Sequence, residues 1–277
     1  MGTLYLVATP IGNLEDMTFR AVRVLKEAGL IAAEDTRTSG RLLQHFGIET
    51  PLTSYFEHNK LAKLDRILAA LETGDVALIS EAGMPGISDP GYELVVAAIK
   101  AGYPVVPIPG PSALVTALAA SGLPTDSFVY LGFLPRKSGQ RRAVLREVAD
   151  QPRTVVFYEA PHRVVETLAD LSAELGEERP VVLARELTKR YEEFWRGTLA
   201  EAQAHVAAQE PRGEFVILVG GAPAGQQMWD DERVRQGLRE LQAGGITGSK
   251  AVKQVARQSG RSRSEVYDLW LGMTGST

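Results

Sequence analysis

Residues 75–102 read DVALISEAGMPGISDPGYELVVAAIKAG. The apolar run at 75–80 predicts a buried strand, and the segment 91–102 predicts a helix. Between them, SEAGMPGISDPG (80–91) holds three glycines and two prolines, although roughly two to six residues normally connect a strand to a helix. Glycine lets the backbone approach a ligand closely, and proline stiffens it. The long connection therefore predicts a ligand-binding loop at the end of a strand.

The same alternation of strand and helix continues on both sides of this loop. It favours a mainly parallel α/β sheet covered on both faces. After a break at 123–127, a second alternating set begins, so we expect two consecutive α/β sheet domains, 1–123 and 124–222. The first set comprises strands 3–9, 30–35, 75–80 and 104–109 with helices 17–29, 61–74, 91–102 and 111–122. The second set comprises strands 128–134, 153–159, 180–186 and 213–221 with helices 139–151, 163–176 and 199–208.

The remaining residues, 228–277, predict a small all-helical domain behind the linker GAPAGQQ (221–227). Three helices are expected, at 231–245, 249–260 and 262–273. Ser249 and either Ser262 or Ser264 are suited to cap the last two. A glycine-containing turn joins these two short helices, which is a helix-turn-helix-like pattern.

Composition narrows the function classes. The chain has 277 residues, a net charge of -4 and no cysteine, which excludes disulfides, thiolate zinc sites and cysteine nucleophiles. Contact with nucleic acid would have to come from local basic patches. No metal-binding spacing occurs among the four histidines, so we expect no metal. Without a long apolar run or a leader-like N-terminus, we expect a soluble, cytoplasmic protein.

Unusual residues gather where the strands of the first domain end. These segments are TPIGNLEDMT (9–18), AEDTR (33–37), the loop 80–91 and PGPSAL (109–114). Ligands of open α/β sheets bind beyond the carboxyl ends of the strands, so the four loops together predict a site for a polar, flat-faced small molecule. The dinucleotide fingerprint, the phosphate loop and the nucleophile elbow are absent from the sequence.

Polar residues in and near these loops are candidates for chemistry. The adjacent acids Glu34 and Asp35 are suited to position or deprotonate a hydroxyl; alternatively, they cap the following helix. SYFEHN (54–59) places aromatic rings and His58 where they would stack on a base, although a surface histidine explains His58 equally well.

Basic residues gather after the strands of the second domain. They suit a phosphate-rich partner, or else a solvated helix start. The tail is also basic between 249 and 267, where it serves either nucleic acid or packing. The candidates for binding such a phosphate-rich partner are Arg136, Lys137, Arg141, Arg142, His162, Arg163, Lys189, Arg190, Lys250 and Lys253.

Taken together, the motifs resemble a family of small-subunit ribosomal RNA 2'-O-methyltransferases of the tetrapyrrole-methylase-fold superfamily. The resemblance runs from about residue 3 to 220, and the tail resembles that family's helical C-terminal domain. The segments that carry it are VATPIGNLEDMT, AEDTR, SEAGMPGISDPGYELV, PIPGPSAL, GFLPRK and FYEAPHR. Porphyrin-methylating relatives have Gly-Asp-Pro turns where this chain has Gly12–Asn13–Leu14 and Ala82–Gly83–Met84–Pro85, which argues against a tetrapyrrole acceptor.

The resemblance implies S-adenosylmethionine bound between the two α/β domains, a homodimer, and a cytidine of 16S ribosomal RNA in the decoding region of the 30S subunit as acceptor. We expect Asp35 or His58 to be the base, with Glu34, Arg37, Asn59, Ser88 and Asp89 orienting the hydroxyl or ordering the loops. Alternatives are a tetrapyrrole or protein acceptor, or a non-enzymatic nucleic-acid-binding protein that uses the C-terminal helices. The implied cofactor residues are Pro10, Ala82, Gly83, Met84, Ile87, Ser88, Ser112, Ala113, Glu159 and Leu187.

Overall fold

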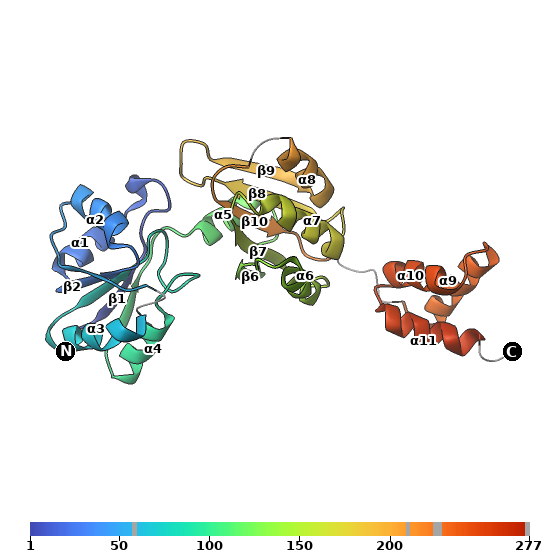
Figure 1. The fold of residues 1–277 in the computed structure, drawn as a ribbon, viewed down its shortest axis with the longest axis horizontal. Coiled ribbons are helices and arrows are strands. Elements are labelled where there is room, and N and C mark those ends of the chain that lie inside the picture. The colour runs from blue at the N-terminus through green and yellow to red at the C-terminus, as the bar shows by residue number, and fades with distance from the viewer. Residues whose placement is uncertain (57–59, 209–210, 224–228, 275–277) are drawn as a thin grey trace. The chain divides into compact units, whose positions relative to one another are not determined.

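The computed structural model describes residues 1–56, 60–208, 211–223 and 229–274. The chain forms two compact units, Met1–Gly220 and Gly221–Thr277. In its described residues the first unit carries a pair of five-stranded sheets (Figure 1). The two α/β sheets and the helical tail of the sequence-based expectation are therefore confirmed.

The first sheet is entirely parallel, with strand order β3-β2-β4-β1-β5. Its short strands are almost wholly apolar, as expected for a sheet buried on both faces. Helices α1 and α2 cover one face, and α3 and α4 cover the other (Figure 1). The strands are β1 (Leu4–Val7), β2 (Leu30–Ala33), β3 (Leu52–Ser54), β4 (Val76–Ile79) and β5 (Val105–Ile108). The helices are α1 (Phe19–Glu27), α2 (Thr36–His45), α3 (Lys60–Thr73) and α4 (Tyr92–Lys100).

The second sheet is mixed, which corrects the expectation of another mainly parallel sheet. Its order is β6-β7-β10-β8-β9, and the last strand of the chain, β10, lies antiparallel between β7 and β8. Strand β9, which the sequence reading omitted, pairs antiparallel with β8. The strands are β6 (Phe128–Phe133), β7 (Thr154–Glu159), β8 (Pro180–Arg185), β9 (Glu193–Thr198) and β10 (Phe215–Val219).

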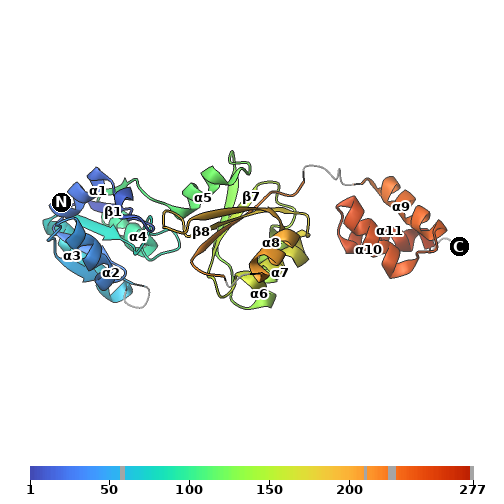
Figure 2. The ribbon, with the colours of Figure 1, turned by 90° about the horizontal axis from the view of Figure 1, so that it is seen from above.

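Helices cover this second sheet unequally. One face packs against α6 (Ser138–Glu147), α7 (Val164–Leu175) and α8 (Leu199–Ala207). The other face packs against α5 (Ala113–Ser121) alone among the described helices, as Figure 2 shows. Leu114 and Leu118 of α5 belong to the same buried cluster as Val182 and Val216. By packing, α5 therefore belongs to the second sheet, although it precedes the boundary expected at 123/124.

The C-terminal unit packs three helices around a small core of its own. Each helix contributes a buried valine to that core, namely Val234, Val252 and Val266. Ser262 caps the last helix reciprocally: its Oγ accepts from the Glu265 N–H at 3.2 Å, and the Glu265 carboxylate accepts from the Ser262 N–H at 2.9 Å. The middle helix begins after Thr247, so Ser249 is not its N-cap. The helices are α9 (Asp231–Ala243), α10 (Gly248–Ser259) and α11 (Arg263–Thr274).

None of the helices in the described ranges combines the length and the apolar character that a membrane crossing requires.

Candidate active site

A cavity of about 400 Å³ lies where strands of the two sheets end. Its size is within the range of small-molecule sites. The first sheet contributes the loops after β1, β4 and β5; the second contributes the end of β6, the end of β7 with the segment after it, and the segment after β8. The start of β10 also lines it, because an antiparallel strand brings its amino end to its neighbours' carboxyl ends. The lining residues are Ile11, Ala82, Gly83, Met84, Ile87, Ser88, Asp89, Ser112, Ala113, Phe133, Tyr158, Glu159, Ala160, Pro161, His162, Glu186, Leu187, Lys189, Glu214, Phe215 and Val216.

The loop 80–91 is pinned to the first strand-end loop by backbone hydrogen bonds. Thr9 and Gly83 exchange both N–H···O bonds, each at 2.9 Å. The Thr9 hydroxyl also donates to the Ser80 carbonyl at 3.2 Å. Gly83 has φ +83°, a conformation that side chains disfavour. The loop thus presents backbone, rather than side chains, to the cavity at this point.

Ser88 ties the same loop to the second sheet. Its Oγ lies 2.6 Å from the Tyr130 hydroxyl on β6. Ser88 has φ +65°, and the other non-glycine residues with positive φ in the described chain are Glu186 and Thr188. Ser88 and Glu186 line the cavity, and Thr188 lies between lining residues. Such backbone strain is typical of functional sites and persists where the surroundings hold it.

The wall from the second sheet is built on a buried carboxylate. Glu159 is 1% exposed and accepts hydrogen bonds from the Ala160 N–H at 2.9 Å and the Thr167 hydroxyl at 2.6 Å. The Glu159 carboxylate also forms an ion pair with Arg163, whose Nε lies 3.3 Å from it. Full hydrogen bonding offsets the cost of burying the charge.

Three acids, Glu34, Glu81 and Asp89, interact after β2 and β4. Burial raises the pKa of Asp89 to about 6, with Glu81 adding to the rise and a hydrogen bond from Ser80 opposing it. Burial, Asp89 and Glu81 also raise the pKa of Glu34. A carboxylate with a pKa just below neutral is ionised at pH 7 and still basic enough to accept a proton, so Asp89 is suited to general-base chemistry.

Asp35, one of the two residues expected to act as base, has a structural role instead. Its carboxylate caps α2 by accepting from the Arg37 N–H at 2.7 Å, and it pairs with the Arg37 guanidinium at 3.0 Å. These bonds lower its pKa to about 2, so it is a poor proton acceptor. The alternative reading of Glu34–Asp35 as a helix cap is therefore right for Asp35. The other expected base, His58, and Asn59 lie outside the described residues.

The residues expected to hold the cofactor come together in space. All of them line the cavity except Pro10, which is buried beside the lining residue Ile11. The sequence reading missed Phe133 and Tyr158 of β6 and β7. It also missed Glu214–Val216, because it placed β10 parallel to its neighbours. The aromatic residues at the ends of these two strands (128–134 and 153–159) were the available signal for the first two.

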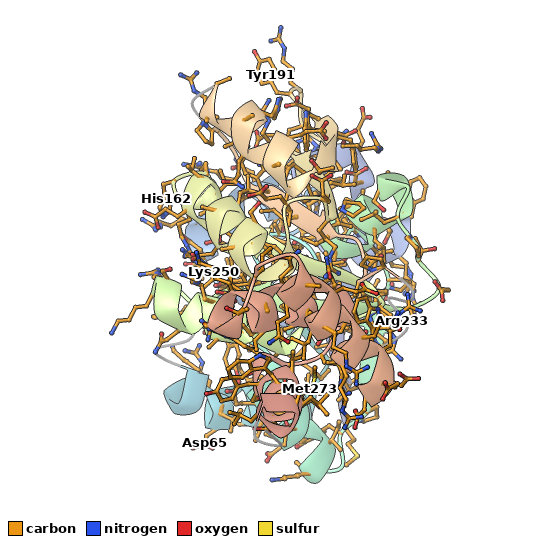
Figure 3. All side chains as sticks on the ribbon, turned by 90° about the vertical axis from the view of Figure 1, so that its right-hand side faces the viewer. Asp65, His162, Tyr191, Arg233, Lys250 and Met273 are labelled. Atoms are coloured by element: carbon orange, nitrogen blue, oxygen red, sulfur yellow. The ribbon has the colours of Figure 1, made fainter. Side chains whose placement is uncertain are left out.

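The basic candidates fall into three groups. Arg136, Lys137 and Arg190 are exposed, and exposed His162 also lines the cavity; Figure 3 labels His162 at the edge of the molecule. Lys189 lines the cavity while paired with Glu186 at 2.9 Å and Glu214 at 3.5 Å. Lys250, labelled in Figure 3, and Lys253 are exposed on α10 of the C-terminal unit.

The remaining basic candidates are engaged within the fold. Arg141 is 1% exposed and pairs with Asp170 at 2.6 Å, so its expected role in holding phosphate is wrong. Arg163 donates to the carbonyls of Leu134 at 2.8 Å and Pro135 at 3.2 Å, in addition to its pairing with Glu159. Arg142 pairs with Glu174 at 2.5 Å. In the part of the chain that the structure describes, no cluster of His, Asp or Glu suits a metal ion.

Comparison with known proteins defines the class of this fold and site. The family model for tetrapyrrole (corrin/porphyrin) methylases matches residues 3–203. Among solved structures, a uroporphyrin-III C-methyltransferase from Thermus thermophilus is similar with a TM-score of 0.55 and 25% identity, covering 80% of this chain and 96% of that one. The cobalt-precorrin-4 methyltransferase shares the fold with a TM-score of 0.59 at 17% identity, covering 79% of this chain and 94% of that one. The chain belongs to the tetrapyrrole methylase family.

Relatives of higher sequence identity show to which group within this family the chain belongs. A protein from Synechocystis named ribosomal RNA small subunit methyltransferase I is 51% identical over 273 residues, which is 98% of each chain. Its namesake from Pseudomonas aeruginosa is 48% identical over 281 residues, 100% of this chain and 99% of that one. Within the methylase family, the chain is thus a member of the ribosomal RNA small subunit methyltransferase I group.

Proposed function

We propose that this protein transfers a methyl group from S-adenosylmethionine to the ribose 2'-oxygen of a cytidine in 16S ribosomal RNA. The names of its nearly full-length relatives support ribosomal RNA as the substrate. The motif resemblance supports the cytidine 2'-oxygen, the decoding region, the assembled 30S subunit and a homodimeric, cytoplasmic enzyme. The single observation that carries the catalytic proposal is Asp89, an acid with a raised pKa in the wall of the cavity.

The cavity fits the cofactor in size and in the chemistry of its lining. One structural neighbour was solved as a complex with S-adenosylhomocysteine. In this chain, the backbone of Ala82–Met84 and of Ser112–Ala113 would hold the cofactor from the first sheet, and Leu187 with Glu159 from the second. The carboxylates of Glu34, Glu81 and Asp89 provide a negative field that favours a positively charged sulfonium.

When bound, S-adenosylmethionine would supply an electrophilic methyl carbon, to which the ribose oxygen would form a C–O bond as the C–S bond breaks. A ribose hydroxyl is a weak nucleophile, so it must lose its proton as the bond forms. Asp89 accepts this proton. Ser88, fixed through Tyr130, holds the segment that carries Asp89 against the second sheet, which limits motion of the base.

The acceptor side is suited to RNA rather than to a tetrapyrrole. Exposed Arg136 and Lys137 follow β6, and His162 follows β7. His162 lines the cavity, and Arg136 and Lys137 come three and four residues after the lining residue Phe133. Phosphates of a bound RNA strand would neutralise these charges.

Incubation with labelled S-adenosylmethionine tests the proposal. Small subunits lacking the modification, free 16S RNA and a uroporphyrinogen-type tetrapyrrole are offered separately. We expect label in the small subunits, recovered in one methylcytidine whose 3' phosphodiester resists alkaline cleavage. Label in the tetrapyrrole, or in a base rather than a ribose, would contradict the proposal.

A further inference from the structure

Phe133 is an exposed aromatic residue in the wall of the cavity. It ends β6, is 57% exposed and lines the cavity together with Tyr158 and His162. The pairing of β6 with β7 shifts register between Tyr130 and Phe133, and Gly132 has φ +64°. Irregularities of this kind re-aim the following side chain. The strand thus departs from regular pairing at the residue that carries an exposed ring to the cavity.

The ring has a fixed support. Its centroid lies 5.5 Å from that of Tyr158, at an interplanar angle of 64°. Tyr158 in turn contacts Tyr130 edge-on at 5.3 Å, and its hydroxyl accepts from the Leu114 N–H at 3.1 Å. Edge-on support leaves more than half of the Phe133 surface available for another flat molecule.

The chain after Phe133 is also held in place. Arg163 donates to the carbonyls of Leu134 and Pro135 and is itself fixed by the buried Glu159. A braced aromatic residue loses little entropy when it binds a ligand. The exposed side chain is therefore presented by a rigid segment rather than by a mobile loop.

Two positively charged side chains come shortly after Phe133 in the chain. Arg136 and Lys137 are exposed, and within the described residues no ion pair is formed by either side chain. Helix α6 begins after Lys137 without a side-chain cap, so the positive end of its dipole adds to the two cations. The nearby carboxylate of Asp170 is neutralised by Arg141. Aromatic surface beside phosphate-binding cations matches a nucleotide, with one part for the base and one for the phosphate.

We propose that Phe133 stacks on the base of the acceptor nucleotide and thereby positions its ribose in the cavity. This inference rests on the proposed function. A ribose can enter an enclosed site only if its nucleotide leaves the stack of the RNA, and a base splayed out in this way is commonly held on an aromatic side chain. The cations Arg136 and Lys137 contact the adjoining phosphate.

The test compares Phe133→Ala, Phe133→Trp and Phe128→Ala. Phe128 is the matched control, because it begins the same strand, is 39% exposed and does not line the cavity. The measurements are kcat/KM for small subunits, the Kd for S-adenosylmethionine and the oligomeric state. We expect kcat/KM to fall roughly 5- to 150-fold for Phe133→Ala, as for loss of stacking on one base. Phe133→Trp should retain most activity, and Phe128→Ala all of it.

Each other outcome overturns the inference. An unchanged kcat/KM for Phe133→Ala shows that the ring does not contact the acceptor. A parallel rise in the Kd for S-adenosylmethionine assigns Phe133 to the cofactor, and a changed oligomeric state assigns it to a contact between copies. Failure of the proposed function looks different, because the unsubstituted enzyme would then not methylate small subunits at all.

Discussion

The two walls of the cavity differ in their chemistry. The first sheet supplies glycine- and proline-rich loops and the acid Asp89. The second sheet supplies aromatic rings and further carboxylates, and the exposed cations Arg136 and Lys137 follow its lining residue Phe133 in the chain. Ser88 and Tyr130 join the two walls by a hydrogen bond.

This difference separates two tasks within one site. Backbone and carboxylates suit a compact cationic cofactor and the removal of a proton. Rings and cations suit bases and phosphates. If the separation is correct, substitution of Asp89 changes the rate of methyl transfer, whereas substitution of Arg136 and Lys137 changes the affinity for RNA.

The largest effect is expected for Asp89→Asn, which removes the proton acceptor while keeping the shape. Single-turnover methylation at saturating cofactor should slow by about 10²-fold or more. Because the carboxylate acts when ionised and its pKa is raised to about 6, the unsubstituted rate should fall as pH drops through 6. Glu81→Gln, which alters a neighbouring exposed acid, should leave most of the rate intact. A full rate for Asp89→Asn would place the base elsewhere.

Asp89→Asn should also change the thermal stability of the protein in a pH-dependent way. The folded-state pKa of Asp89 lies above its ordinary value of 3.8, so the ionised group destabilises the fold above pH 6. Asp89→Asn should therefore raise Tm at pH 8, and the gain should vanish as pH falls below about 4. Thermal unfolding at both pH values measures this, and an equal gain at the two would argue against a raised pKa.

A smaller effect is expected in the second wall, for Arg136→Ala combined with Lys137→Ala. Binding of small subunits should weaken about tenfold at moderate salt, and the slope of log K against log salt should flatten by roughly 1 to 2. The rate at saturating RNA should stay near its normal value. Arg142→Ala is the control, because that guanidinium already pairs with Glu174. An unchanged salt slope would remove these two residues from the RNA-binding surface.

The smallest catalytic effect is expected for Asp35→Ala. The loss of an N-cap should lower Tm by roughly 2–4 °C, while the methylation rate changes less than about twofold. Because the pKa of Asp35 is lowered to about 2, this stabilisation is present above its ordinary value of 3.8 and is lost as pH falls toward 2. A large loss of rate at unchanged Tm would return Asp35 to the role of base.

The sequence was most informative where local pattern determines structure. The loop 80–91 and the turn at Ser112–Ala113 could be placed at one site because carboxyl ends of parallel strands meet at one edge. The same rule failed for β10, whose direction depends on pairing with distant β7 and β8. Local pattern carries no information about such pairing, so Glu214–Val216 could not be predicted.

The roles of individual charged residues were also difficult to predict from the sequence. Arg136 and Arg141 look alike in the sequence, yet one is exposed and the other is 1% exposed against Asp170. Asp35 and Asp89 each follow a strand, yet Arg37 lowers the pKa of the first and burial raises that of the second. The role of Arg141 depends on Asp170, which is remote in sequence, and that of Asp89 depends on burial, whereas the partner of Asp35 is local.

The position of β10 also bears on how the protein is made. The first sheet has all its strands once Ile108 has been synthesised, whereas the centre of the second sheet is filled only by Phe215–Val219. Chains fold as they emerge from the ribosome, at roughly 5–20 residues per second. One half of the cavity is thus complete in a nascent chain well before the other, and β7 and β8 await the strand that joins them until nearly four-fifths of the protein has been translated.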